Sequence, residues 1–119
     1  KRVENYIPLQ KIKGKDKDGL LVVGWGGTYG TLFGAVNELQ KQGENIGFSH
    51  FNYINPLPSN TAEIFSRFKK IVVCELNLGQ FASHLRNLLP QFEYMQINKV
   101  QGQPFTIGEL KEKISEIKI

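Results

Sequence analysis

Apolar residues along this chain gather into short runs, and each run is followed by a stretch with helical spacing. Two of the runs, Leu20-Leu21-Val22-Val23 and Ile71-Val72-Val73-Cys74, are continuous, which is typical of strands buried on both faces of a parallel sheet. The whole pattern predicts four strands, at residues 20–25, 46–51, 70–75 and 93–98. The last of these alternates between apolar and polar side chains, so we expect it nearer an edge of the sheet.

Helices are expected after each strand, at residues 28–42, 60–68 and 79–89 and from Thr106 or Gly108 onward. Gly43 suits the left-handed residue that ends the first helix. Asn60, with Glu63 three residues later, predicts a capping box at the start of the second. Four strand-then-helix units in order predict an α/β domain with a mostly parallel sheet and helices on both faces.

The length of 119 residues fits one domain with a single core. Residues 1–12 look extended and lead into a polar turn at residues 13–19, and we expect residues 1–17 to link a preceding domain to the domain at residues 18–119. No apolar stretch approaches the roughly 18 residues that span a bilayer, and the chain does not open with the apolar region of a signal peptide. The single cysteine, Cys74, excludes an internal disulfide, so we expect a cytoplasmic protein.

The net charge of +4 is modest. Its lysines alternate with glycine and aspartate near the start of the chain and with glutamate near the end, which is typical of a solvated surface. A nucleic-acid interface would interleave basic residues with exposed aromatic ones, so we expect neither a nucleic acid nor a membrane as partner. His50 and His84 are too far apart in the sequence to form a standard metal motif.

Two turns carry the candidate chemistry, because each follows a buried strand and precedes a helix. They are residues 24–30 and 75–80, and ligands bind open α/β sheets at the carboxyl ends of strands. The first turn approaches the dinucleotide fingerprint G-x-G-x-x-G, but Tyr29 stands where the third glycine belongs, and His50 stands near the position of the expected acidic residue. A tight strand-to-helix turn is therefore favoured over a nicotinamide or flavin site.

Three polar or reactive residues lie at or near the strand ends. His50 is either a ligand-facing acid or base or, more commonly, a hydrogen-bonded structural residue. Glu75 ends a buried run, and a buried carboxylate needs a partner, which the amides of a neighbouring turn or another chain can supply. Cys74 fits a small core side chain. No nucleophile elbow, phosphate-loop lysine or carboxylate pair completes an active site.

Three segments with a distinctive order and spacing suggest a family. They are residues 21–30, residues 50–58 with Asn55-Pro56-Leu57-Pro58, and residues 73–80 with Glu75-Leu76-Asn77-Leu78-Gly79-Gln80; residues 99–105 fit as well. Together they closely resemble the C-terminal domain of the α subunit of 2-oxoacid:ferredoxin oxidoreductases, most nearly the 2-oxoglutarate type. The resemblance covers about residues 18–115.

The resemblance implies a three-layer α/β/α domain with the transketolase C-terminal-like fold and a mostly parallel, five-stranded sheet. The intact enzymes of this family convert 2-oxoglutarate, coenzyme A and oxidised ferredoxin into succinyl-CoA, CO₂ and reduced ferredoxin. Their thiamine diphosphate, Mg and iron–sulfur cluster belong to other domains, so this chain is expected to bind no cofactor by itself and to be inactive alone. The implied partners are the preceding domains of the same subunit, the β subunit, ferredoxin and coenzyme A.

We expect Glu75, Asn77 and Gln80 at the carboxyl edge of the sheet, beside the glycine turn and the strand end that holds His50. They would contact a neighbouring domain or subunit there, and in the chain alone be partly exposed or hydrogen-bonded to adjacent turns. The full set of interface or ligand-edge candidates is Gly26, Gly27, Thr28, Tyr29, His50, Asn55, Glu75, Asn77 and Gln80. Two other functions stay open: a free-standing nucleotide- or cofactor-binding module, and the same domain of a pyruvate-type oxidoreductase or transketolase relative.

Overall fold

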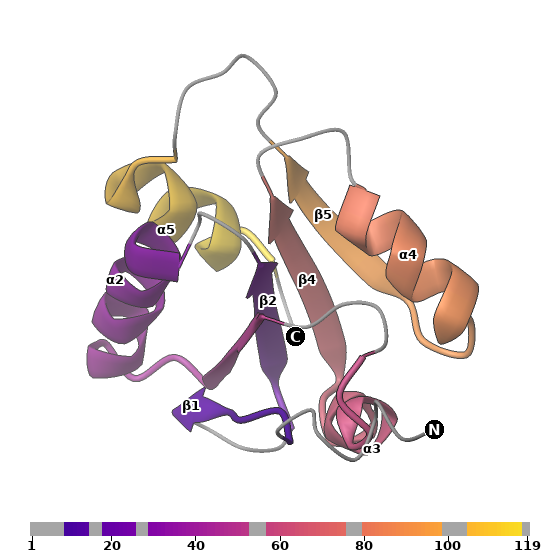
Figure 1. Ribbon diagram of the computed structural model, residues 1–119. Coiled ribbons are helices and arrows are strands. Elements are labelled where there is room, and N and C mark those ends of the chain that lie inside the picture. The colour runs from indigo at the N-terminus through magenta and orange to yellow at the C-terminus, as the bar shows by residue number, and fades with distance from the viewer. Residues whose placement is uncertain are drawn as a thin grey trace.

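A computed structural model describes residues 9–14, 18–25, 29–52, 57–75, 80–98 and 105–117, and in these residues a five-stranded sheet lies between two layers of helices (Figure 1). The strands are β1 (Lys13–Gly14), β2 (Leu20–Trp25), β3 (Ile46–Phe51), β4 (Lys70–Glu75) and β5 (Tyr94–Asn98). The helices are α2 (Tyr29–Lys41), α3 (Thr61–Ser66), α4 (Gln80–Leu88) and α5 (Ile107–Ser115). The predicted three-layer α/β fold is confirmed.

The strand order across the sheet is β1-β3-β2-β4-β5. The pairings among strands β2 to β5 are all parallel, which confirms the prediction that the four predicted strands form one parallel sheet with β2 beside β4. The alternating strand, β5, lies at an edge of the sheet, as expected. The predicted polar turn at residues 13–19 is wrong at its start, because Lys13 and Gly14 pair antiparallel with Phe48 and Gly47 as a short edge strand.

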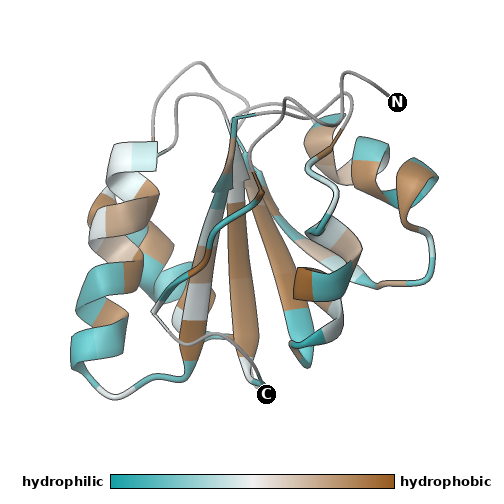
Figure 2. Cartoon of the chain, turned by 60° about the horizontal axis from the view of Figure 1, so that its bottom comes forward, coloured by the Kyte–Doolittle hydropathy of each residue, from teal (hydrophilic) through white to brown (hydrophobic). Residues whose placement is uncertain are grey.

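Each face of the sheet has its own hydrophobic core because successive strand residues point to opposite faces. Val22, Phe48, Val72 and Ile97 pack against α2 and α5, while Val23, Phe51, Val73 and Tyr94 pack against α3 and α4. In Figure 2 the strands in the middle of the sheet are mostly brown, and teal residues gather on the helices. Burial on both faces therefore explains why β2 and β4 are continuously apolar.

Helices α2 and α5 lie side by side on one face of the sheet (Figure 1). They approach closely at Gly34, where a Cβ atom would come within 2.8 Å of the Cδ1 atom of Ile107. Helix α5 begins with a capping box: the Glu109 amide donates to Thr106 Oγ1 at 3.1 Å, and the Thr106 amide donates to Glu109 Oε1 at 2.9 Å. Of the two predicted start points, Thr106 is therefore the cap.

The capping box predicted at Asn60 and Glu63 is wrong. Asn60 precedes α3 but forms no side-chain cap, because its amide group bonds to the backbone of Gln10 instead, accepting from the amide at 2.8 Å and donating to the carbonyl at 3.0 Å. Glu63 forms an ion pair with Arg67, at 2.7 Å. Helix α3 ends at Ser66, two residues short of the prediction.

Residues 9–14, which fall within the predicted linker, are held against β3 by a small polar network. The Gln10 side chain donates to Ser49 Oγ and to the His50 carbonyl, both at 2.7 Å, and Ser49 Oγ donates to the Lys11 carbonyl at 2.7 Å. Ser49 is only 1 % exposed, so these bonds satisfy a polar group within an apolar layer. Part of this segment therefore packs as an integral strand of the sheet, while the division at residue 17 stays a prediction.

We expect Asn60→Ala to lower the free energy of unfolding by about 1–2 kcal/mol, because two partly buried hydrogen bonds to Gln10 are lost. Urea unfolding followed by circular dichroism measures this change. Asn87→Ala, on an exposed position of α4, is the matched control and should change stability by less than about 0.5 kcal/mol. Equal stabilities of the two variants would contradict the assigned role of Asn60.

Candidate functional site

Strands β2, β3 and β4 end at one edge of the sheet, since all three are parallel. Their ends are level: Gly24 of β2 lies opposite His50 of β3 on one side and Cys74 of β4 on the other. Of the candidate residues at this carboxyl edge, the structure describes Tyr29, His50, Glu75 and Gln80. Candidates Gly26, Gly27, Thr28, Asn55 and Asn77 lie outside the described residues.

Glu75 is the most deeply placed of the four. Its side chain is 2 % exposed, yet both carboxylate oxygens have partners: Oε1 accepts from the Phe81 amide and Oε2 from the Ala82 amide, each at 2.9 Å. These amides belong to the first turn of α4, where backbone N–H groups have no partner within the helix and the helix dipole favours a negative charge. Glu75 therefore caps α4 from the end of the preceding strand.

Trp25 joins this contact from the neighbouring strand. Its indole Nε1 lies 3.4 Å from Glu75 Oε1, and its ring is 5.7 Å from the ring of Phe81. The ends of β2 and β4 and the start of α4 are thus tied together around one carboxylate. Glu75 is among the candidates from the sequence and Trp25 is not, although the place of Trp25 at the end of an apolar strand is a signal that points to it.

Tyr29 and His50 form a second group. The Tyr29 ring lies edge-on to the His50 ring, with centroids 5.1 Å apart, and is stacked on Phe33 at 5.9 Å with an interplanar angle of 9°. Tyr29 and Phe33 are 41 % and 39 % exposed. The ammonium of Lys13 lies 5.4 Å from the Phe33 ring, within cation–π range. The result is an exposed aromatic and basic patch beside the start of α2.

The two groups lie on opposite faces of the sheet. His50 follows Phe48 by two residues and shares its α2 face, whereas Glu75 follows Val73 by two and shares the α4 face. Gln80, the first residue of α4, is exposed on that second face. The described candidates therefore lie at the carboxyl edge, but His50 and Glu75 do not form one catalytic cluster there.

The described residues give little support for nucleophilic, acid–base or metal-dependent catalysis. Burial raises the pKa of the Cys74 thiol far above its usual range, with the nearby Glu75 charge adding to the effect, so the thiolate needed for nucleophilic attack is not formed. Burial also raises the pKa of Tyr94 to about 12, and its hydroxyl donates to the Leu89 carbonyl at 2.8 Å. No three histidine, cysteine or acidic residues within the described segments gather closely enough to hold a metal ion.

The helices in the described part of the chain are also too short or too polar to cross a membrane.

Comparisons with known proteins identify related sequences. Residues 19–110 match the family described as pyruvate:ferredoxin oxidoreductase core domain II. The chain is 36 % identical over 91 residues to 2-oxoglutarate oxidoreductase subunit KorA of Mycobacterium tuberculosis, which covers 76 % of this chain and 14 % of that protein. It is 31 % identical over 112 residues to 2-oxoacid:ferredoxin oxidoreductase 1, subunit alpha, of Aeropyrum pernix, covering 90 % and 17 %. The chain thus spans only 14 % and 17 % of these two relatives.

Solved structures share the fold. A 2-oxoglutarate:ferredoxin oxidoreductase from Magnetococcus marinus, with 2-oxoglutarate, coenzyme A and succinyl-CoA bound, superposes with a TM-score of 0.88 at 20 % identity, over 96 % of this chain and 20 % of that one. An inactive β4 tetramer of a split-gene transketolase superposes with a TM-score of 0.64 at 15 % identity, over 89 % and 40 %. The predicted likeness to a transketolase fold is confirmed.

We expect Glu75→Gln to lower the free energy of unfolding by about 2 kcal/mol, because an amide offers only one acceptor oxygen and sets its NH₂ group against a backbone N–H donor. Urea unfolding measures the loss, and the fluorescence of Trp25, the single tryptophan of the chain, reports on the contact itself. Glu112→Gln, on an exposed position of α5, makes the same chemical change and should have little effect. A Glu75→Gln variant as stable as the parent would show that the cap contributes nothing.

Proposed function

Because the chain belongs to the pyruvate:ferredoxin oxidoreductase core domain II family, we propose that it works as one domain of the α subunit of a 2-oxoglutarate:ferredoxin oxidoreductase. The whole enzyme would convert 2-oxoglutarate and coenzyme A into succinyl-CoA and CO₂, releasing protons to solvent and passing the two electrons to oxidised ferredoxin, which becomes reduced. The observation that carries the choice of substrate is the 36 % identity to a subunit named as a 2-oxoglutarate oxidoreductase. The family description favours pyruvate as the alternative 2-oxoacid.

The role we assign to this domain is assembly rather than chemistry. An iron–sulfur cluster is commonly held by four cysteine thiolates, and this chain has a single cysteine, fully buried within β4. The described residues likewise offer no group of side chains suited to the Mg ion of thiamine diphosphate. The described residues therefore do not fit an iron–sulfur cluster or an Mg ion, and our proposal places thiamine diphosphate, Mg and the cluster in other parts of the enzyme.

The carboxyl edge is our proposed contact with the rest of the enzyme. Partners and ligands of parallel α/β domains commonly meet them at this edge, and the exposed Tyr29 and Gln80 lie there on opposite faces of the sheet. Glu75 supports this edge indirectly, because its hydrogen bonds fix the first turn of α4 on which Gln80 stands. We include Gly26, Gly27, Thr28, Asn55 and Asn77 in the proposed interface from their positions in the sequence, between each strand and the helix that follows it.

The activity is tested on the purified complex that contains this subunit. We expect reduction of ferredoxin that depends on both 2-oxoglutarate and coenzyme A, with pyruvate a clearly poorer substrate, and no turnover by the 119-residue chain alone. Absorbance of the reduced acceptor and chromatography of succinyl-CoA measure the reaction. Faster turnover of pyruvate would move the assignment to the pyruvate type, and turnover by the isolated chain would overturn the assembly role.

The interface is tested by placing a negative charge at exposed neutral residues. We expect Tyr29→Glu and Gln80→Glu to weaken association between the α subunit and its partner subunit at least tenfold, because a desolvated charge at an interface costs more than about 1.4 kcal/mol. Analytical ultracentrifugation of the purified subunits measures the affinity. Gln42→Glu, on an exposed position just after α2 at the opposite edge of the sheet, is the control. If neither Tyr29→Glu nor Gln80→Glu changed the affinity between the subunits, the proposed interface at the carboxyl edge would be wrong.

A further inference from the structure

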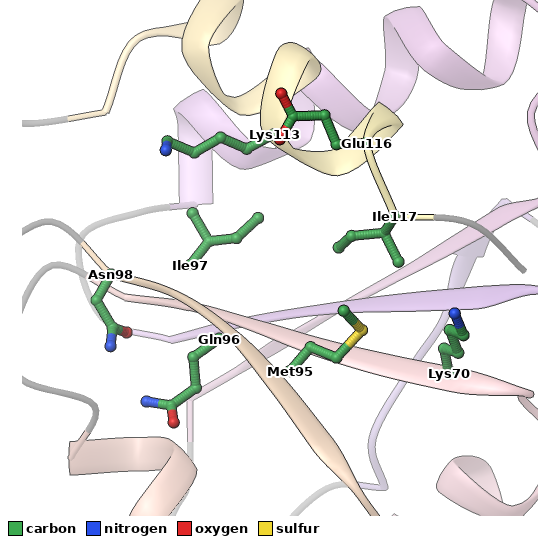
Figure 3. Close-up of a pocket in the computed structure, with 8 residues that line it drawn as sticks. All are labelled: Lys70, Met95, Gln96, Ile97, Asn98, Lys113, Glu116 and Ile117. Carbon is green, nitrogen blue, oxygen red and sulfur yellow. The ribbon is translucent and has the colours of Figure 1, made fainter.

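A pocket that the function above does not use lies between β5 and the C-terminal end of α5 (Figure 3). Its volume is about 650 Å³, within the range of about 300–1,000 Å³ that small-molecule sites occupy. The residues that line it are Lys70, Met95, Gln96, Ile97, Asn98, Lys113, Glu116 and Ile117. It opens on the α5 side of the sheet, and none of the carboxyl-edge candidates lines it.

The floor of the pocket is apolar. Met95 and Ile97 are two residues apart on β5, so both face the α5 side, and Ile117 reaches the same space from just beyond the end of α5 (Figure 3). Ile97 is 8 % exposed, whereas Met95 is 40 % exposed. The end of α5 thus covers one part of this strand and leaves the other open to a ligand.

Cationic groups stand at the two ends of this floor. In Figure 3, Lys113 extends along the helix toward the end of the pocket where Asn98 lies, and Lys70 stands at the opposite end, beyond Met95. The only acidic residue among the lining residues is Glu116, and its carboxylate points away from the strand (Figure 3). The order along the pocket is therefore cation, apolar surface, cation.

We propose that this pocket binds an elongated dianion with an apolar middle, the class represented by linear α,ω-dicarboxylates. One carboxylate would pair with Lys113 and the other with Lys70, while the side chains of Gln96 and Asn98 point to the opposite side of β5 (Figure 3). The methylene chain between them would lie on Ile97, Ile117 and Met95, where removing it from water is favourable. The proposal rests on the pocket alone and does not depend on the oxidoreductase assignment.

The first test compares dicarboxylates of increasing length, and a dicarboxylate with a monocarboxylate of the same length. Succinate, adipate, suberate and the monocarboxylate hexanoate are titrated into the 119-residue chain, with NMR detection of the methyl groups of Met95, Ile97 and Ile117. Affinity should rise about fourfold for each added methylene until the chain spans the pocket, and adipate should bind more tightly than hexanoate. The Ile64 methyl, in the core on the opposite face, should not shift. Affinity independent of chain length, or equal for adipate and hexanoate, would overturn the proposal.

The second test changes the charges at the pocket. Lys113→Gln should weaken binding of suberate about two- to fivefold, the usual effect of one exposed ion pair, and Glu116→Gln should strengthen it, since a nearby negative charge is removed. Lys41→Gln, at the exposed end of α2, removes the same charge elsewhere and should leave binding unchanged. An equal loss in the Lys41 and Lys113 variants would mean attraction to overall charge only and would overturn the site.

Discussion

The pairing of β2 with two parallel neighbours is the constraint on which the rest of the structure depends. With β3 on one side and β4 on the other, β2 has no open edge, and both of its faces must be covered by helices. This requirement places α2 and α5 on one face and α3 and α4 on the other. Because β2, β3 and β4 are parallel, all three strands end at the same edge of the sheet. Polar residues that are far apart in the sequence therefore lie near one another at this edge.

A buried carboxylate stabilises that edge. Placing Glu75 at the end of a strand that is otherwise apolar would be costly if its charge had no partner. The start of α4 supplies two amides and Trp25 an indole N–H, so the same residue that needs partners also satisfies the first turn of a helix. The hydrogen bonds of Glu75 thus stabilise the fold of this domain. Because Tyr29 and Gln80 are exposed, they are better placed for the proposed contact with another part of an enzyme.

The residues of this domain agree with the proposed assembly role in a larger enzyme. Its one cysteine is occupied in packing, and its two candidate polar groups at the edge are kept apart by the sheet itself. Such a domain can present surfaces and loops to its neighbours while the reacting groups are held elsewhere. The basic and apolar pocket beside β5, on the α5 side of the sheet, is a second surface of this domain and the proposed binding site of a small anion.

The sequence by itself determined the four parallel strands, their helices and the edge position of β5, because continuous and alternating apolar runs report directly on burial of one or both faces. It also identified Glu75 as a residue in need of a partner and the segments that resemble the oxidoreductase family. Only the tertiary structure decided which partner each polar group takes. Asn60 bonds to Gln10 rather than capping its own helix, Lys13 and Gly14 join the sheet rather than a turn, and Glu75 is separated from His50. These outcomes depend on contacts between residues far apart in the chain. The local spacing of residues does not indicate which distant group lies within hydrogen-bonding distance in the folded protein.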